Sequence, residues 1–170
     1  RARSGSSAAS AVAGVYAINK LIGEPLAKQQ LLPFAMQGEA SADGAWHADN
    51  VGPSLLGGIV FIRSNQELDI AQLPVPKDLW AAVVHPDIEI LTKVAREILP
   101  TNIPMVNATQ QIGNLGGLIC GLIQEDYAMI GRSIHDVIAE PRRQKLIPEF
   151  YNAKRAAMSN GALGFSISGA

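Results

Sequence analysis

Apolar positions in the first quarter of the chain follow a helical pattern that glycine and proline interrupt. Residues 6–22 are rich in alanine and apolar on most sides, and they begin at two serines, so they predict a buried helix with a serine cap. Gly23 should end this helix, a second helix should restart at Glu24, and Pro33 should break or kink it. The short polar stretch 39–44 predicts a loop.

Extended candidates occupy the middle of the chain. Residues 56–63 and 68–73 are rich in β-favouring side chains, and the polar triplet 64–66 between them is turn-like, so the pattern predicts a β-hairpin. Residues 79–85 form a further run of β-favouring residues and predict a strand.

Helical periodicity returns after that strand, over residues 92–99, 110–124, 129–138 and 147–160. Two prolines at positions 74 and 76 indicate a linker between the hairpin and these elements. We therefore expect two domains, over residues 1–76 and 77–170.

Composition narrows the class of protein. A hydrophobic share of 48% over 170 residues is enough to bury a core. The formal net charge of -1 provides no basic field for nucleic acid or for an anionic membrane surface. The single cysteine, Cys120, has no partner for an intrachain disulfide, and no apolar run is long enough to span a bilayer. The sequence predicts a soluble, cytoplasmic protein.

The first candidate for chemistry is the stretch Gly5-Ser6-Ser7-Ala8 at the start of the first helix. Closely spaced backbone N–H groups, two hydroxyls and the positive end of a helix dipole suit a phosphate and its metal ion. By themselves these residues fit an ordinary serine cap equally well.

The second candidate is the segment 39–53, which gathers Glu39, His47, Asp49 and Asn50 among small residues. A carboxylate such as Glu39 could complete an oxygen shell around Mg²⁺ that a serine hydroxyl and nucleotide phosphates begin. The alternatives are that Glu39 is a solvated loop acid, that Asp49 and Asn50 shape the turn before a proline, and that His47 is structural.

Several motifs resemble one enzyme family in order along nearly the whole chain. Residues 5–10 resemble the second half of the phosphate-loop motif of GHMP kinases, and residues 164–170 resemble the start of their third motif. The string His-Ala-Asp-Asn-Val at 47–51 is similar to the signature of the homoserine kinases within that superfamily. Residues 92–96 and 136–143 resemble the same family.

The resemblance implies an α+β, two-domain GHMP kinase fold. It consists of a ribosomal-protein-like N-terminal domain, which binds ATP, and a ferredoxin-like C-terminal domain, both incomplete here. We expect these 170 residues to be the central part of a longer protein and to lack kinase activity by themselves. The resemblance also allows a homodimer.

The resemblance further implies an activity: ATP- and Mg²⁺-dependent phosphorylation of the side-chain hydroxyl of L-homoserine, giving O-phospho-L-homoserine in threonine biosynthesis. Two alternatives stay open. One is a GHMP kinase for another small alcohol, and the other is a non-catalytic relative that binds a nucleotide or an amino acid.

Roles carried over from the family fall on two groups of residues. Gly5, Ser6, Ser7 and Ala8 would wrap the ATP phosphates, with Ser6 or Ser7 joining Glu39 as Mg²⁺ ligands. Arg3 departs from the family here, because it replaces a glycine of the phosphate loop.

The acceptor site is implied by the second group. Asn50 would orient the acceptor hydroxyl, because an amide cannot act as the base that other family members carry there as aspartate. His47 and Asp49 would line the substrate pocket, and Arg96 and Arg143 would bind the amino-acid carboxylate. Arg142 stands next to Arg143 and is the alternative for that position, and a surface ion pair is the alternative role for each arginine.

Overall fold

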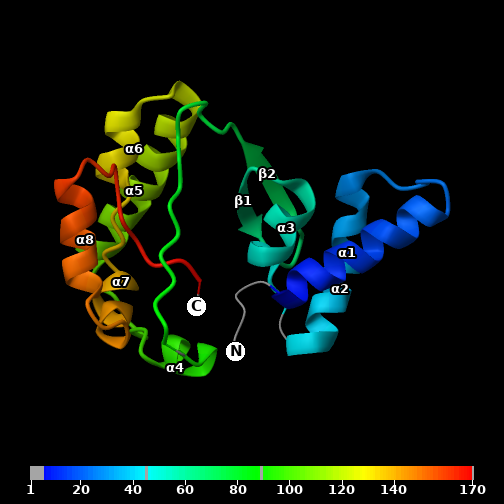
Figure 1. Cartoon of the computed structure of the whole chain (residues 1–170), viewed down its shortest axis with the longest axis horizontal. Coiled ribbons are helices and arrows are strands. Elements are labelled where there is room, and N and C mark those ends of the chain that lie inside the picture. Colours follow the sequence, from blue (N-terminus) through cyan, green and yellow to red (C-terminus); the bar gives the residue numbers. More distant parts are fainter. Residues whose placement is uncertain (1–5, 45, 89, 170) are drawn as a thin grey trace. The chain divides into compact units, whose positions relative to one another are not determined.

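The computed structural model describes residues 6–44, 46–88 and 90–169. The chain forms two compact units, and the first ends at Val75 and the second begins at Pro76. Helices and a two-stranded sheet make up the first unit, and its elements are coloured blue to green in Figure 1. In chain order they are α1 (Ser6–Leu21), η1 (Lys28–Leu31, a 3₁₀ helix), α2 (Leu32–Asp43), α3 (Ala48–Leu56), β1 (Ile59–Ser64) and β2 (Asp69–Leu73).

Helix α1 confirms the first predicted helix, but the prediction that it is buried on most sides is wrong. Only Ala8, Val12 and Asn19 are buried, while Ile18 is 60% and Leu21 85% exposed. Alanine-rich composition predicts a helix equally well for one buried stripe and for complete burial, so it could not decide between them.

Helix α2 corrects two predictions. Residues 24–27 are not helical, and Pro33 lies in the first turn of α2 rather than breaking an earlier helix. Proline is tolerated in a first turn because its missing N–H has no intrahelical acceptor there. The predicted loop over 39–44 is also wrong, since α2 continues through Asp43 and ends at Gly44, whose φ of 74° suits glycine.

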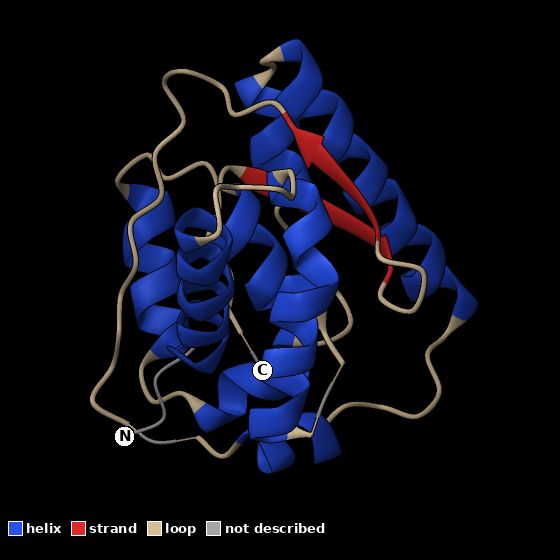
Figure 2. Ribbon diagram, turned by 90° about the vertical axis from the view of Figure 1, so that its right-hand side faces the viewer, coloured by secondary structure: helices blue, strands red, loops and turns tan. Residues whose placement is uncertain are grey.

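The β-hairpin is confirmed, and the segment before it forms a helix that the sequence did not predict. Strands β1 and β2 pair antiparallel with a register irregularity near Ser64, and Figure 2 shows them in red. Helix α3 contains Pro53 in its interior, the feature that favoured a turn over a helix in the sequence. Gly52 of α3 is buried and faces the hairpin, where a Cβ would make an ordinary van der Waals contact with the Val60 side chain at 3.5 Å.

The core of this unit lies between α1, η1, α2 and α3. Its buried members are Ala8, Val12, Leu31, Leu32, Ala35, Met36, Ala48, Val51 and Leu55, with Ile62 and Ile70 of the hairpin packed against them. Burial of this one apolar cluster fixes how the three helices lie on one another.

The second unit contains helices and extended coil within its described residues. Its helices are α4 (Thr92–Glu97), α5 (Met105–Gln124), α6 (Tyr127–Ser133), α7 (Glu140–Arg143), η2 (Gln144–Leu146) and α8 (Phe150–Ser159). All four predicted helices are confirmed, with ends shifted by several residues, while the one-turn helix α7 was not predicted. No helix in the described part of the chain is long and apolar enough to cross a membrane.

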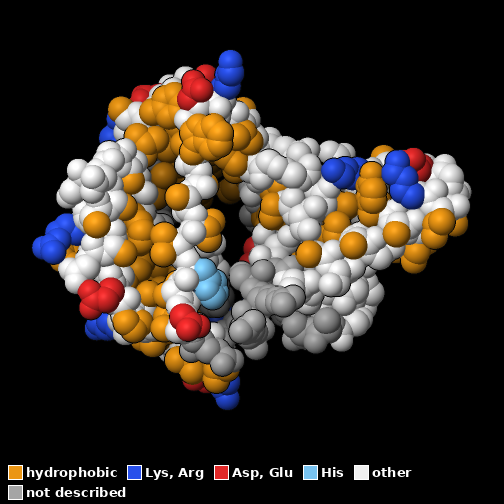
Figure 3. All heavy atoms as spheres, viewed as in Figure 1, with side chains coloured by type: hydrophobic (Ala, Val, Ile, Leu, Met, Phe, Trp, Pro, Cys, Tyr) orange, Lys and Arg blue, Asp and Glu red, His pale blue; other side chains and the backbone are white. Residues whose placement is uncertain are grey.

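The strand predicted over 79–85 is wrong, because these residues form an extended coil (Figure 1). Trp80 is 89% and Val83 87% exposed, so the segment is unburied despite its β-favouring residues. Propensity describes how well side chains fit a sheet surface, and it cannot supply a pairing strand. Apolar side chains are also exposed elsewhere on the surface (Figure 3).

Helices α5 and α6 pack closely because glycine leaves room between them. A Cβ on Gly121 would lie 2.9 Å from both the backbone N and the Cγ1 of Ile130, and a Cβ on Gly117 would lie 2.5 Å from the Ser133 hydroxyl. A backbone atom cannot move aside as a flexible side chain can. Gly121 therefore sets the distance between these two helices.

We predict that Gly121→Ala destabilises the protein by roughly 1–3 kcal/mol, the usual cost of overpacking. The matched control is Gly113→Ala in the same helix, where a Cβ would meet nothing within 4 Å. That change should be neutral or stabilising by up to about 1 kcal/mol, because alanine favours helix. Thermal and urea unfolding of both variants measure the difference, and equal effects would contradict the packing role of Gly121.

Candidate functional site

Ser7 and Glu39 lie 32 residues apart in sequence and meet in the structure. The Ser7 hydroxyl donates a 2.9 Å hydrogen bond to Oε1 of Glu39. Glu39 is only 6% exposed, and its second oxygen, Oε2, is buried without a hydrogen-bond partner among the described residues. A buried carboxylate with an unpaired oxygen is costly to stability, so its presence indicates a site for a cation or a donor.

Small residues bring the two helices that carry this pair together. Ser7 lies in the first turn of α1 and Glu39 in the second half of α2. A Cβ on Gly38 would lie 3.1 Å from Cβ of Ala11, so glycine permits the helices to approach next to Glu39. Ala8 and Ala35 are fully buried on the same helices. The close approach lets a short serine side chain reach the glutamate.

Of the remaining phosphate-loop residues, Ser6 is exposed at the first position of α1, and its carbonyl accepts a hydrogen bond from the Ser10 hydroxyl. Ala8 is buried and therefore contributes packing at this position. Gly5 and Arg3 lie outside the described residues. The described part of the loop thus consists of the first helical turn, which presents N–H groups that have no acceptor within the helix and two hydroxyls.

His47, Asp49 and Asn50 lie together at the start of α3. His47 occupies the N-cap position with extended backbone, and its side chain makes no capping hydrogen bond. Asp49 and Asn50 are exposed in the first turn, where the helix dipole favours a negative or acceptor group. Because the helix begins here, three polar side chains project from four consecutive residues.

Asn65, in the turn of the hairpin, holds this helix start and was interpreted from the sequence only as a turn residue. Its Oδ1 accepts a 2.8 Å hydrogen bond from the Ala48 N–H, and its carbonyl accepts a 2.9 Å bond from the Trp46 indole N–H. The two bonds lie on either side of His47. No local sequence signal predicts a contact between residues 17 positions apart.

In the second unit, Arg143 connects three segments. Its Nε donates a 3.0 Å hydrogen bond to the Ala95 carbonyl, and its Nη1 donates a 3.0 Å bond to the Gly169 carbonyl. Ala95 precedes Arg96 on α4, and Gly169 belongs to the glycine-containing segment at residues 164–169. A guanidinium has five N–H donors, and these two bonds to described residues use two of them.

The short helix that carries Arg143 is anchored at its start. Asp136 accepts hydrogen bonds from the backbone N–H groups of Ile138, Ala139 and Glu140. Glu140 is 7% exposed and pairs with Lys154 on α8. These contacts fix α7 between its neighbours, and no sequence motif predicted the Glu140–Lys154 pair.

Comparisons with known proteins agree on one family. Residues 4–58 match the model of the GHMP kinases N terminal domain, and residues 118–170 match that of the GHMP kinases C terminal domain. The chain is 51% identical over 165 residues to a homoserine kinase of Chlorobium phaeobacteroides, covering 97% of this chain and 52% of that relative. A homoserine kinase of Arabidopsis thaliana is 41% identical over 157 residues, covering 91% of this chain and 42% of that relative.

A solved structure matches the same stretch. The crystal structure of homoserine kinase from Cytophaga hutchinsonii superposes with a TM-score of 0.94 at 55% sequence identity, covering 97% of this chain and 52% of that one. The chain belongs to the GHMP kinase family. It spans about half the length of the relatives it matches at 51% identity. The predicted α+β GHMP kinase fold is confirmed.

Within this GHMP kinase, Arg96 is exposed at the end of α4, and Arg142 is exposed beside Arg143. The contacts of Arg143 distinguish it from its neighbour, because its guanidinium is held by two carbonyls. An alignment alone could not separate two adjacent arginines.

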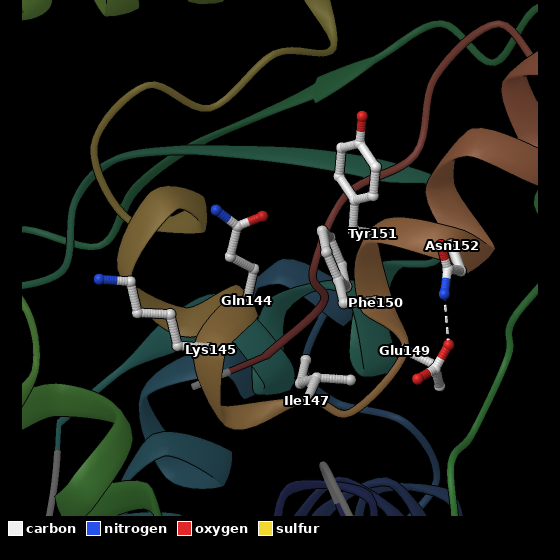
Figure 4. A pocket seen from close by; sticks show the side chains of 7 residues that line it. All are labelled: Gln144, Lys145, Ile147, Glu149, Phe150, Tyr151 and Asn152. Carbon is white, nitrogen blue, oxygen red and sulfur yellow. Dashed lines mark hydrogen bonds between the residues drawn. The ribbon is translucent and has the colours of Figure 1, made fainter.

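An open hollow of about 450 Å³ lies elsewhere in the second unit of this GHMP kinase. Figure 4 shows the side chains that line it, and they come from η2, from the loop after it and from the start of α8. Asn152 donates a hydrogen bond to Glu149 at its rim. None of the site residues predicted from the sequence lines this hollow, so we assign it no function.

Proposed function

We propose that this GHMP kinase transfers the γ-phosphoryl group of ATP to the side-chain hydroxyl of L-homoserine, giving O-phospho-L-homoserine in threonine biosynthesis. The observation that carries the proposal is the Ser7–Glu39 pair with its buried, unpaired carboxylate oxygen. Relatives named homoserine kinase at 51% identity support the choice of acceptor. A cytoplasmic location, a homodimer and domains over residues 1–76 and 77–170 belong to the same proposal.

The oxygens at the Ser7–Glu39 pair fit Mg²⁺, a hard cation that prefers oxygen ligands. Among the described residues no three His, Cys, Asp or Glu side chains cluster as a metal site. The protein would therefore supply Glu39 and one serine hydroxyl, from Ser7 or, as the alternative, from Ser6. The nucleotide and water would supply the other ligands. A bound Mg²⁺ neutralises charge on the phosphates.

The start of α1 would hold the nucleotide phosphates. Its first backbone N–H groups have no acceptor within the helix, so these groups, with Gly5 preceding them in sequence, can donate to phosphate oxygens, and the helix dipole favours the negative charge. Ser6 adds a hydroxyl donor next to the same oxygens, whereas Ser7 donates its one O–H to Glu39 and offers lone pairs to the cation. The buried Ala8 keeps the helix packed on α2, so the donors stay fixed in direction.

The start of α3 would hold the acceptor. Asn50 orients the acceptor hydroxyl, Asp49 binds the ammonium group, and His47 lines the pocket. Since an amide cannot accept a proton, the hydroxyl proton passes to an oxygen of the transferred phosphoryl group as the new O–P bond forms and the bridging O–P bond breaks. Rate enhancement then comes from positioning and charge neutralisation.

Arg143 and Arg96 would bind the homoserine carboxylate. Arg143 is supported by its position, because two carbonyls orient its guanidinium and these bonds use two of its five donors. Arg96 follows Ala95, whose carbonyl accepts one of those bonds. Arg142 has no such anchoring contact among the described residues.

Steady-state assays of the intact protein with homoserine, mevalonate and shikimate side by side test the proposed function. Homoserine should give a kcat/KM at least about a hundredfold above either other alcohol, because neither of them carries the ammonium group that Asp49 would bind. Preference for another alcohol would support a different GHMP kinase. Nucleotide binding without turnover of any alcohol would support the non-catalytic alternative.

A further inference from the structure

We propose that Asn65 is a positioning residue for the acceptor site, acting from the turn of the β-hairpin through the start of helix α3. This inference rests on the proposed function only in assigning His47, Asp49 and Asn50 to the acceptor. The observation behind it is that Asn65 bonds to both neighbours of His47: its carbonyl accepts from the Trp46 indole, and its side chain accepts from the Ala48 N–H.

Helix α3 lacks a capping side chain of its own. The first N–H groups of a helix have no intrahelical acceptor, and most helices satisfy one of them with the side chain at the N-cap. His47 holds that position and makes no capping bond. Asn65 supplies the acceptor instead, from 17 residues away, by taking the Ala48 N–H at 2.8 Å.

The second bond fixes the chain just before the helix. The Trp46 indole N–H donates to the Asn65 carbonyl at 2.9 Å, so the side chain of the residue before His47 is bonded to Asn65 as well. Trp46 is 37% exposed, and its ring is therefore held by this bond as well as by packing. Because the Trp46 side chain and the Ala48 N–H both bond to Asn65, moving the His47 backbone away from the hairpin turn would strain or break these hydrogen bonds.

The hairpin is a rigid support for this contact. Its strands are paired from Ile59 with Leu73 to Ser64 with Asp69, and the Ser64 hydroxyl accepts the Glu67 N–H within the turn. Helix α3 packs on the same unit through Val51 and Leu55, which are 0% and 2% exposed. The apolar residues fix the body of the helix, and Asn65 fixes the end that carries the polar groups.

Asn65 would affect how the acceptor-binding side chains are oriented, and it would take no part in the chemical step. Asp49 and Asn50 are exposed in the first helical turn, the part of a helix that frays most readily when its N–H groups lose their acceptors. Misplacing a binding group by about 1 Å lowers activity strongly. Loss of the Asn65 acceptor should therefore weaken acceptor binding while the nucleotide site on α1 and α2 is unchanged.

The test compares Asn65→Ala with Asn65→Asp in the intact protein. Aspartate keeps an acceptor oxygen, and its charge suits a helix N-terminus, whereas alanine removes the acceptor. We expect Asn65→Ala to raise the KM for homoserine about tenfold and to leave the KM for ATP within about twofold. Asn65→Asp should stay within about threefold of the wild type in both.

Two further variants provide a second test and a control. Trp46→Phe removes the indole donor but keeps an aromatic ring, and it should shift the acceptor KM in the same direction by a smaller factor. Gln66→Ala, an exposed neighbour in the same turn, is the matched control and should change neither KM. If Asn65→Ala does not fold, Trp46→Phe and Asn65→Asp decide the outcome.

Hydrogen–deuterium exchange of the segment 46–56 gives a readout independent of turnover. Exchange should be faster in Asn65→Ala and close to the wild type in Asn65→Asp. Faster exchange with a native acceptor KM would overturn the positioning role, and so would equal impairment by alanine and aspartate. If the wild type phosphorylates a different alcohol, the proposed function fails and Asn65 is judged on that alcohol, so the two claims fail separately.

Discussion

In the intact protein, Glu39→Ala is expected to lower kcat by roughly a thousandfold or more at ordinary magnesium concentrations, the largest catalytic effect that we predict. The pair formed by Glu39 and Ser7 presents a buried carboxylate oxygen with no partner among the described residues. Removal of that oxygen would take away the proposed metal ligand, and metal-ion stabilisation of phosphoryl transfer is worth several kcal/mol.

Glu39→Gln separates loss of the metal ligand from loss of packing. Glutamine has nearly the same size and can still accept the Ser7 hydrogen bond, but it carries no charge. Because a buried unpaired charge opposes folding, the glutamine variant should unfold at the same temperature as the wild type or a higher one while remaining inactive. Thermal unfolding and steady-state kinetics at varied magnesium measure both quantities.

Gln37→Ala provides the control on the same helix, at an exposed position two residues before Glu39, and it should retain normal kinetics. ATP binding measured without magnesium should be similar in all these variants, since the first turn of α1 is unchanged. Normal kcat and normal magnesium dependence in Glu39→Gln would refute the metal-binding role.

The sequence predicted the elements that carry a continuous hydrophobic pattern over their own residues. Helix α1, the hairpin and the long helix α5 each carry a continuous periodic pattern over their own residues, and each was predicted. Helices α2 and α3 contain Pro33 and Pro53, and proline can begin a helix, end one or lie within one. A break was predicted at Pro33, and no helix was predicted around Pro53; packing against the core decided otherwise in both places.

Candidate site residues were chosen from their chemical types, and the structure adds which of them meet. Glu39 was expected in a loop, yet it lies on a helix whose close approach to α1 brings it to Ser7. Contacts such as Asn65 with Ala48, or Arg143 with Ala95 and Gly169, join residues far apart in sequence. Single-residue propensities contain no signal for such pairs.

Arg143→Ala is expected to raise the KM for homoserine by roughly 10- to 100-fold, the second of the two largest effects. A charge-assisted hydrogen bond to a carboxylate contributes about 1.5–3 kcal/mol, which corresponds to that range. Arg143 also joins α4 and the segment at Gly169 through its two carbonyl bonds. Its removal should therefore lower the unfolding temperature of this unit by a few degrees as well.

Arg143→Lys tests geometry against charge. Lysine keeps the positive charge, but it cannot bond both carbonyls and still present a planar pair of donors to a carboxylate. The lysine variant should recover less than a tenth of the lost affinity, measured as KM for homoserine with ATP saturating. Substantial rescue would mean that charge alone is sufficient.

Arg142→Ala is the control that distinguishes the two adjacent arginines. Arg142 is exposed and its side chain has no carbonyl contact among the described residues, so its removal should leave the KM for homoserine within about threefold. An equal rise in both alanine variants would place the carboxylate contact on the pair rather than on Arg143. If the KM for homoserine rose in Arg142→Ala alone, Arg142 would be the carboxylate-binding residue. The bonds from Arg143 to Ala95 and Gly169 would then only hold α4, α7 and the glycine-containing segment together.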